Sequence, residues 1–185
     1  MRIYGNRQLK TLPGQATRPT TARVREAVFN IWQGEIAGCR WLDLCAGNGT
    51  MGAEALCRGA ATVVGIEQAG RACQISRHNW QQVARVEQEW RILRGDVRQR
   101  LLDLSGQVFD RIYFDPPYDS GLYETVIAAI ATEQILAPDG ELAVEYSADC
   151  WQAGAIASLA PSRHKHYSRT SLVFYRWATP PAAIT

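Results

Sequence analysis

The fold is decided by one stretch, Trp41-Leu42-Asp43-Leu44-Cys45-Ala46-Gly47-Asn48-Gly49-Thr50-Met51-Gly52. Its first five residues form a compact apolar segment, typical of a buried strand. The glycines follow in a Gly-x-Gly-x-x-Gly pattern, and we expect a helix after them through about Arg58. Glycines permit a tight turn and a close ligand approach, and the start of a helix offers free N–H groups. The stretch therefore predicts a strand, a ligand-binding loop and a helix in succession.

The same alternation of strands and helices continues outward in both directions. We expect a helix from Thr20 or Thr21 to about Trp32, and later helices at 69–84, 96–104, 121–132 and within 149–159. Further strands are expected at 62–66, 90–93, 109–114 and 141–146, and a closing hairpin at about 163–168 and 171–177. Strands separated by such helices predict an α/β, Rossmann-like fold. Its seven-stranded sheet is mostly parallel, with helices on both faces and a C-terminal antiparallel hairpin.

Composition is that of an ordinary globular chain, with 185 residues, 46% hydrophobic and 21% charged. We expect a single domain over residues 1–178 and a disordered tail at 179–185. No apolar run approaches the roughly 20 residues that span a bilayer, and no signal-peptide core is present, so a cytoplasmic location is expected. The five cysteines contain no Cys-x-x-Cys pair, which favours reduced thiols and no metal site. A monomer is the default expectation.

The net charge of +2 hides an uneven distribution. Residues 1–40 carry a net charge of +5 and residues 160–177 one of +4, while the rest of the chain carries −7. Eighteen of the twenty basic residues are Arg, which suits bidentate phosphate contacts. Two basic ends around an acidic middle indicate a polyanionic partner approached by the ends.

Carboxylates follow three further strands. In an open parallel sheet, ligands bind at the carboxyl ends of the strands. Glu67 ends the second strand, where a carboxylate can accept hydrogen bonds from both hydroxyls of a ribose. Asp96 ends the third strand, where it could bind an adenine amine, and Asp115 ends the fourth. The alternatives are a solvated loop acid for Glu67 and a helix N-cap for Asp96.

The fourth strand leads into Asp115-Pro116-Pro117-Tyr118. Each proline fixes its own φ and lacks an N–H group, so this corner is stiff. The Asp offers an acceptor and the Tyr a flat face, and a planar, amine-bearing substrate such as a nucleobase needs both. The alternative interpretation is a Pro-Pro turn with a helix-capping Asp.

The Gly loop and Glu67 fit a nicotinamide dehydrogenase as well as an S-adenosylmethionine (SAM) methyltransferase, since both cofactors contain adenosine. Asp43 lies where it would repel the pyrophosphate of a dinucleotide, whereas a cationic sulfonium cofactor tolerates it. A structural hydrogen bond that holds the loop is an equal alternative for Asp43. A dehydrogenase also has no reason to place the Asp115–Tyr118 corner after the fourth strand, so a methyltransferase is favoured.

Asp115-Pro116-Pro117-Tyr118 resembles the Asp/Asn-Pro-Pro-Tyr/Phe signature of SAM-dependent enzymes that methylate exocyclic amines. Three stretches, Arg18–Asn30, Asp43–Ala60 and Phe114–Tyr118, further resemble the RsmD family. That family methylates the exocyclic amine of one guanine in bacterial 16S ribosomal RNA. This chain departs from the family in having Asn48 where Ser is usual. It also lacks the usual Arg-Gly-Arg cluster in its amino-terminal arm.

The resemblance implies a class I SAM-dependent methyltransferase acting on 16S rRNA or an assembling small ribosomal subunit. The catalytic residues are then Asp115, Pro116, Pro117 and Tyr118, with Asp115 and the Pro116 carbonyl accepting the amine hydrogens and Tyr118 stacking on a flipped base. The cofactor residues are Asp43, Ala46, Gly47, Asn48, Gly49, Glu67, Gln68, Asp96 and Val97.

The resemblance also implies an RNA-binding role for the amino-terminal part of the chain. It predicts an arm or hairpin at 1–17, a lid helix at 20–33, and RNA contacts from Arg7, Lys10, Arg18, Arg23 and Arg25. Solvated or ion-paired arginines are the alternative for the last three. For the whole chain, an enzyme acting on an adenine amine in DNA or RNA remains an alternative.

Overall fold

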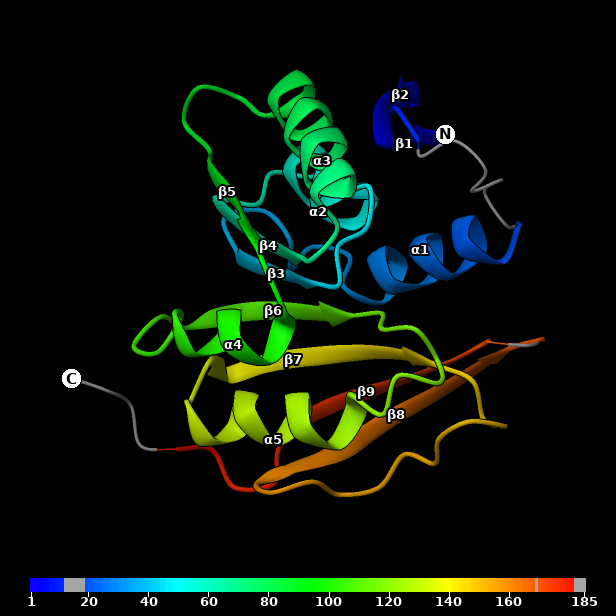
Figure 1. Ribbon diagram of the computed structural model, residues 1–185, viewed down its shortest axis with the longest axis vertical. Helices are drawn as coiled ribbons and strands as arrows, with labels where there is room; N and C mark the ends of the chain where they lie inside the picture. The colour runs from blue at the N-terminus through cyan, green and yellow to red at the C-terminus, as the bar shows by residue number, and fades with distance from the viewer. Residues whose placement is uncertain (12–18, 169, 182–185) are drawn as a thin grey trace.

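A computed structural model describes residues 1–11, 19–168 and 170–181 (Figure 1). The central sheet has the strand order β5-β4-β3-β6-β7-β9-β8. The strands are β3 (Arg40–Leu44), β4 (Thr62–Glu67), β5 (Glu89–Arg94), β6 (Phe109–Phe114), β7 (Leu136–Tyr146), β8 (Leu159–Tyr167) and β9 (Thr170–Trp177). The helices are α1 (Pro19–Ile31), α2 (Thr50–Cys57), α3 (Gly70–Val83), α4 (Val97–Leu102) and α5 (Tyr123–Thr132).

The sheet reverses its direction of growth at β3. The chain builds β4 and β5 on one side of this strand, then crosses over to place β6 and β7 on the other. Within this sheet, β9 runs antiparallel to both of its neighbours, and all the other strands are parallel to one another. Because Leu44 lies opposite both Ile66 and Phe114, the carboxyl ends of β3, β4 and β6 share one edge. The expected fold class is therefore confirmed.

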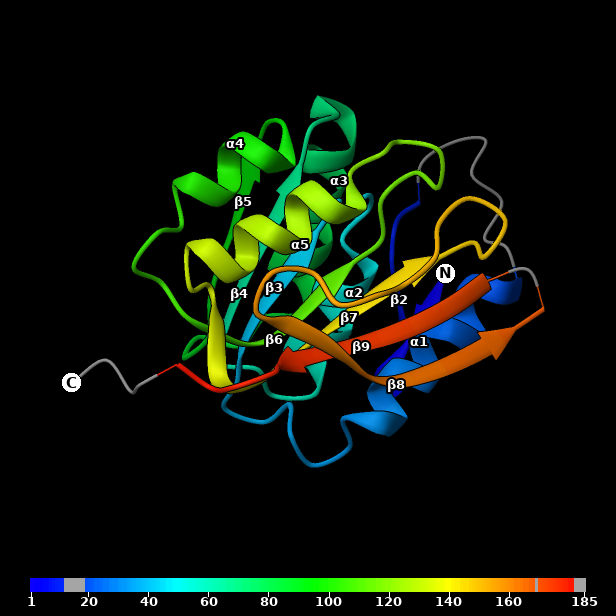
Figure 2. The same ribbon diagram turned by 90° about the horizontal axis from the view of Figure 1, so that it is seen from below.

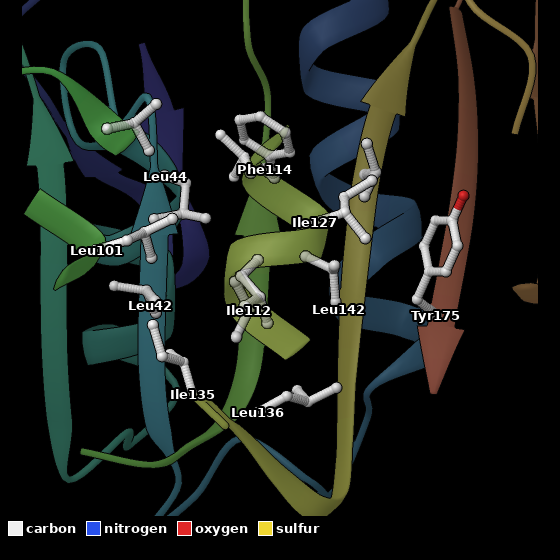
Figure 3. Packing of buried hydrophobic residues seen from close by; sticks show 14 of the residues in the cluster. Leu42, Leu44, Leu101, Ile112, Phe114, Ile127, Ile135, Leu136, Leu142 and Tyr175 are labelled. Atoms are coloured by element: carbon white, nitrogen blue, oxygen red, sulfur yellow. The ribbon is translucent and has the colours of Figure 1, made fainter. Parts of the chain in front are cut away.

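Alternate residues of the strands pack on opposite faces of the sheet. Leu42, Leu44 and Ile112 face Leu101 of α4 and Ile127 of α5, as Figure 3 shows. Trp41 and the other alternate side chains face α1, α2 and α3. Each fully buried aliphatic side chain contributes about 1.5–3 kcal/mol, so these two cores hold the strand ends in a fixed relation.

Three elements differ from the sequence-based expectation, and one of them is β8, which begins at Leu159 and not at about residue 163. The helix expected within 149–159 is wrong, because this segment is an irregular connection in which Trp151 stacks on Tyr123 with ring centroids 4.4 Å apart. Its Gly154 carbonyl accepts a hydrogen bond from the Tyr175 hydroxyl at 2.9 Å, a tertiary contact that an isolated helix would not make. β7 also begins earlier than expected, at Leu136, because the Pro138-Asp139-Gly140 turn is an irregularity inside the strand.

The amino-terminal arm is a small hairpin in its described part. β1 (Arg2–Ile3) and β2 (Arg7–Gln8) pair in antiparallel fashion around the 3-10 turn η1 (Tyr4–Asn6). Residues 12–18 lie outside the described part of the chain, so the arm expected over 1–17 is seen only through residue 11.

Candidate active site

The Gly loop between β3 and α2 is held by three side chains of α3. Each donates one hydrogen bond to one of three consecutive loop carbonyls, at 2.7–2.9 Å: Ser76 to Gly47, Asn79 to Asn48 and Trp80 to Gly49. Asn79 and Trp80 are fully buried. The conformation of the loop is therefore fixed by the protein itself.

The indole of Trp80 also explains why the loop and its surroundings contain glycine. A Cβ atom would lie 2.7 Å from Trp80 at Gly49, 2.1 Å at Gly52 and 2.7 Å at Gly65. Distances this short cannot be accommodated without a shift of the indole or the backbone. Gly49 in addition has a φ of +72°, which L side chains rarely adopt.

Glu67 lies where the sequence predicts a ribose-binding acid. Its two carboxylate oxygens accept hydrogen bonds from the backbone N–H groups of Gly47, at 2.8 Å, and Ala69, at 2.7 Å. A carboxylate oxygen can accept more than one hydrogen bond, so both oxygens retain capacity for a ligand. The side chain is half-buried beside Gly47, whereas the neighbouring Gln68 is exposed.

Asp43 connects the end of β3 to the start of α2. It is 2% exposed, and its Oδ2 accepts a hydrogen bond from the Gly52 N–H at 3.0 Å. The pKa of Asp43 is raised to about 7, chiefly by burial and also by the negative charge of Glu67, against the lowering effect of the Gly52 hydrogen bond. This geometry supports the structural alternative considered for Asp43.

The raised pKa of Asp43 predicts a pH dependence of stability. The folded protein holds this proton more tightly than the unfolded chain, so Asp43 contributes stability that is lost as the pH rises from 3.8 to about 7. In Asp43→Asn we expect a smaller loss of Tm across this window than in the wild type.

Asp96→Asn is the control for this pH profile. The Arg98 guanidinium lowers the pKa of Asp96 to about 2, so the stability that it contributes is lost only as the pH falls below 3.8. Thermal unfolding between about pH 2 and pH 8 measures both effects. Equal pH slopes for Asp43→Asn and the wild type between 3.8 and 7 would contradict the assignment.

Asp96 is the N-cap of α4, which was the alternative role considered for this residue. Its Oδ1 accepts from the Arg98 N–H at 2.9 Å, and its Oδ2 lies 2.7 Å from the Arg98 guanidinium. An N-cap role leaves room for a further hydrogen bond to a ligand amine. The side chain of Val97, at the start of α4, packs into the hydrophobic core.

The Asp115–Tyr118 corner follows β6 at the same sheet edge. Asp115 and Tyr118 are half-buried, Pro116 is buried and Pro117 is exposed. The Asp115 N–H donates to the Leu44 carbonyl at 3.4 Å, which ties the corner to the end of β3. The catalytic candidates and the Gly loop are thus attached to adjacent strands.

Glu145 is a site residue that the sequence analysis missed. It is 5% exposed on β7 and accepts hydrogen bonds from the hydroxyls of Tyr113 and Tyr118, the latter at 3.1 Å. The Tyr118 hydroxyl also lies 3.0 Å from the Thr170 hydroxyl on β9. Burial raises the pKa of Glu145 above its usual range. The sequence contains one sign of this role, which is an acid at the end of an otherwise apolar stretch, Leu142-Ala143-Val144-Glu145.

Cys45 lies among the acidic groups of the site. It has a φ of +60°, a strained value for a residue other than glycine at the end of a strand. The pKa of Cys45 is raised to about 12, chiefly by burial and also by the negative charges of four carboxylates: Glu67, Asp115, Asp43 and Asp96. The thiol therefore lies within the electrostatic reach of four acids, and their combined field favours a cationic ligand.

Of the basic residues expected to contact RNA, some are exposed and one is buried. Arg7, Lys10 and Arg23 are exposed. Arg7 donates to the Val83 carbonyl at 3.3 Å, and the Lys10 N–H donates to the Asn79 side chain at 2.9 Å, which joins the arm to the residue that holds Asn48. Arg18 lies outside the described residues.

The structure gives Arg25 a different role from the RNA contact that was expected. It is 5% exposed, its Nε lies 3.0 Å from a carboxylate oxygen of Glu54 on α2, and it donates to the Arg2 carbonyl at 3.0 Å. The Nε–H does not point along a hydrogen-bond direction, so the contact with Glu54 is ionic. Arg25 anchors the arm to α1 and α2 in this structure and is not exposed to RNA, in line with the ion-paired alternative.

Residues 1–11, 19–168 and 170–181 contain no cluster of three or more His, Cys, Asp or Glu with the geometry to hold a metal ion. In the same part of the chain, no helix has the length and apolar character needed to cross a membrane.

The chain is similar to known proteins over most of its length. The family model described as "Conserved hypothetical protein 95" matches residues 1–176. Ribosomal RNA small subunit methyltransferase D of Escherichia coli (strain K12) is 32% identical over 149 residues, which cover 78% of this chain and 74% of that protein. YlbH of Bacillus subtilis (strain 168) is 29% identical over 172 residues, which cover 92% of this chain and 93% of that protein.

A solved structure shares the whole fold. The structure of yhhF from Escherichia coli matches with a TM-score of 0.83 and 28% identity, and the match covers 96% of this chain and 97% of that chain. Because the family model spans nearly the whole chain, the protein belongs to the Conserved hypothetical protein 95 (RsmD) family and is a SAM-dependent methyltransferase.

Proposed function

We propose that this enzyme transfers the methyl group of SAM to the exocyclic N2 amine of a guanine in small-subunit (16S) ribosomal RNA. The observation that carries the proposal is the attachment of the Asp115–Tyr118 corner to the strand that leads into the Gly loop. The name of the Escherichia coli relative supports ribosomal RNA as the substrate class.

The chemistry of the amine explains the need for such a corner. The lone pair of a guanine N2 atom is delocalised into the ring, so the nitrogen must be oriented in line with the sulfonium methyl group. In the proposed complex, the Asp115 carboxylate and the Pro116 carbonyl accept the two N–H groups and stabilise the positive charge that develops. The N–C bond forms as the S–C bond breaks, which yields S-adenosylhomocysteine (SAH), and the nitrogen releases one proton.

Tyr118 has a fixed orientation in this scheme. Its hydroxyl is held by Glu145 and Thr170, so the ring cannot rotate freely about its side-chain bonds. A base flipped out of its helix gains about 1–3 kcal/mol by stacking on such a ring. We therefore assign Glu145 a positioning role, exerted through Tyr118.

The direct test is methyl transfer from labelled SAM to ribosomal RNA purified from a strain that lacks this gene. Small-subunit RNA and partly assembled subunits are assayed in parallel, and the modified nucleotide is mapped by nuclease digestion and mass spectrometry. Label in an N2-methylguanine of 16S RNA supports the proposal. Label in an adenine, or in DNA only, would replace it with the adenine-amine alternative.

Glu67→Ala tests the proposed ribose contact. Loss of a carboxylate that accepts hydrogen bonds from both ribose hydroxyls is expected to weaken SAH binding by about ten- to a hundredfold, since bonds to charged groups are worth about 1.5–3 kcal/mol. Isothermal titration calorimetry measures the dissociation constant. Glu89→Ala, an exposed acid at the opposite end of the neighbouring strand β5, is the control and should bind SAH as the wild type does. Wild-type affinity in Glu67→Ala would rule out the ribose assignment.

A further inference from the structure

The C-terminal hairpin carries a cluster of basic side chains that the cofactor site does not use. β8 and β9 contain Arg163, His164, Lys165, His166 and Arg176, and neither strand contains Asp or Glu. Glu141 on β7 pairs with Arg176 at 2.9 Å. Arg163 and Lys165 are exposed and have no ion-pair partner among the described residues. Their charge is therefore available to a partner molecule.

These two side chains share one face of the outermost strand. β8 pairs with β9 and lies at the outer edge of the sheet, as Figures 1 and 2 show. Arg163 lies opposite Phe174 and Lys165 opposite Leu172, and residues directly opposite in an antiparallel pair point to the same face. The Arg163 guanidinium lies over the buried ring of Phe174, 5.6 Å from its centroid, while the side chain as a whole is exposed.

The same face leads to the catalytic corner. β8 runs parallel to β6 and β7, so its last residues reach the sheet edge that carries the corner. Tyr167 at the end of β8 lies opposite Thr170, whose hydroxyl is 3.0 Å from that of Tyr118. Lys165 is two residues before Tyr167, or about 7 Å along the strand.

We propose that Arg163 and Lys165 form a second RNA-binding surface, which holds the phosphates next to the target nucleotide while its base enters the Asp115–Tyr118 corner. The inference rests on the RNA substrate proposed above. An RNA backbone fits this surface because Arg can bind a phosphate group in a bidentate manner and Lys can bind one as a point charge. Both side chains lie on the strand that leads toward Tyr118, the ring proposed to stack on the base. The arm with Arg7 and Lys10 packs against α3, and in Figure 1 it lies above α1 whereas β8 and β9 lie below it, so the two surfaces would contact the RNA at separate points.

The test is a double neutralisation, Arg163→Gln/Lys165→Gln, assayed with 16S RNA fragments that the wild type methylates. We expect the dissociation constant for RNA to rise by about tenfold or more at 0.1 M salt. The slope of log K against log[salt] should fall by about 1.4, since each lost phosphate contact on a single strand removes about 0.7. The SAH dissociation constant and the Tm should stay close to those of the wild type.

Two further variants make the result specific. Lys165→Glu reverses an exposed charge without touching the Phe174 contact, so it reports on RNA binding even if the double variant folds poorly. Arg91→Glu makes the same charge change on β5, at the opposite edge of the sheet, and should leave RNA affinity nearly unchanged. Wild-type RNA affinity and salt slope in Lys165→Glu would overturn the surface but leave the methyl-transfer assignment intact. Absence of RNA methylation by the wild type would instead overturn the proposed function.

Discussion

Asp115→Asn is expected to lower kcat for methyl transfer by about 10³-fold, in the range found when a group that stabilises transition-state charge is removed. The amide keeps the shape of the carboxylate but removes its negative charge. It also places an N–H group where an oxygen would accept the hydrogen of the substrate amine. Binding of SAH should change less than threefold if Asp115 contacts the substrate and not the cofactor.

Single-turnover transfer from labelled SAM to 16S RNA measures this loss without interference from product release. Asp119→Asn is a matched control, because Asp119 is an exposed acid four residues further along the same loop. We expect that control to retain nearly full activity. A parallel loss of SAH affinity in Asp115→Asn would instead identify Asp115 as a cofactor or fold residue.

Arg25→Met is expected to lower the free energy of unfolding by about 3 kcal/mol, because removal of one member of a buried ion pair leaves the other charge uncompensated. Glu54 is 2% exposed, and its remaining partner Arg58 lies 2.9 Å away with a partly exposed side chain. The estimate is therefore at the low end of the range for buried pairs. Urea unfolding followed by circular dichroism measures the change.

Arg23→Met separates this effect from a general consequence of replacing arginine on α1. Arg23 is exposed on the same helix, two residues before Arg25, and its replacement should change stability by less than about 0.5 kcal/mol. Equal stability of the two variants would mean that the Arg25–Glu54 pair contributes nothing to the fold. If Arg23 contacts the substrate, Arg23→Met should weaken RNA binding more than Arg25→Met does.

Much of the fold could be predicted from the sequence because hydrophobic patterning and chain connectivity act locally. Strands of five or six apolar residues, separated by helix-length segments, leave few topologies other than an open parallel sheet. That topology brings Glu67, Asp96 and Asp115 to one edge even though they lie far apart in the sequence. The positions of these acids required no knowledge of side-chain packing.

The features that escaped prediction depend on contacts between distant residues. Arg25 is of a residue type that often contacts RNA. It forms a buried ion pair only because the fold brings Glu54 of α2 next to it. The role of Glu145 depends on the register between β6 and β7, which places Tyr113 opposite Ala143, two residues from the acid. The segment at 149–159 has helical propensity, yet the stacking of Trp151 on Tyr123 holds it in an irregular path.

The packing of Trp80 against three glycines implies a pattern of covariation within the family. Gly49, Gly52 and Gly65 come from the loop, α2 and β4, and each leaves space for the same indole. A relative with a smaller residue in place of Trp80 would be free to carry alanine or serine at Gly52, where all the close contacts of an added Cβ are with this indole and the backbone is not strained; at Gly65 the Cδ1 atom of Ile92, 2.9 Å away, would also have to move. The presence of these glycines then depends on the size of an aromatic neighbour as much as on the bound nucleotide. A relative that lacks one of the glycines can still bind the same cofactor.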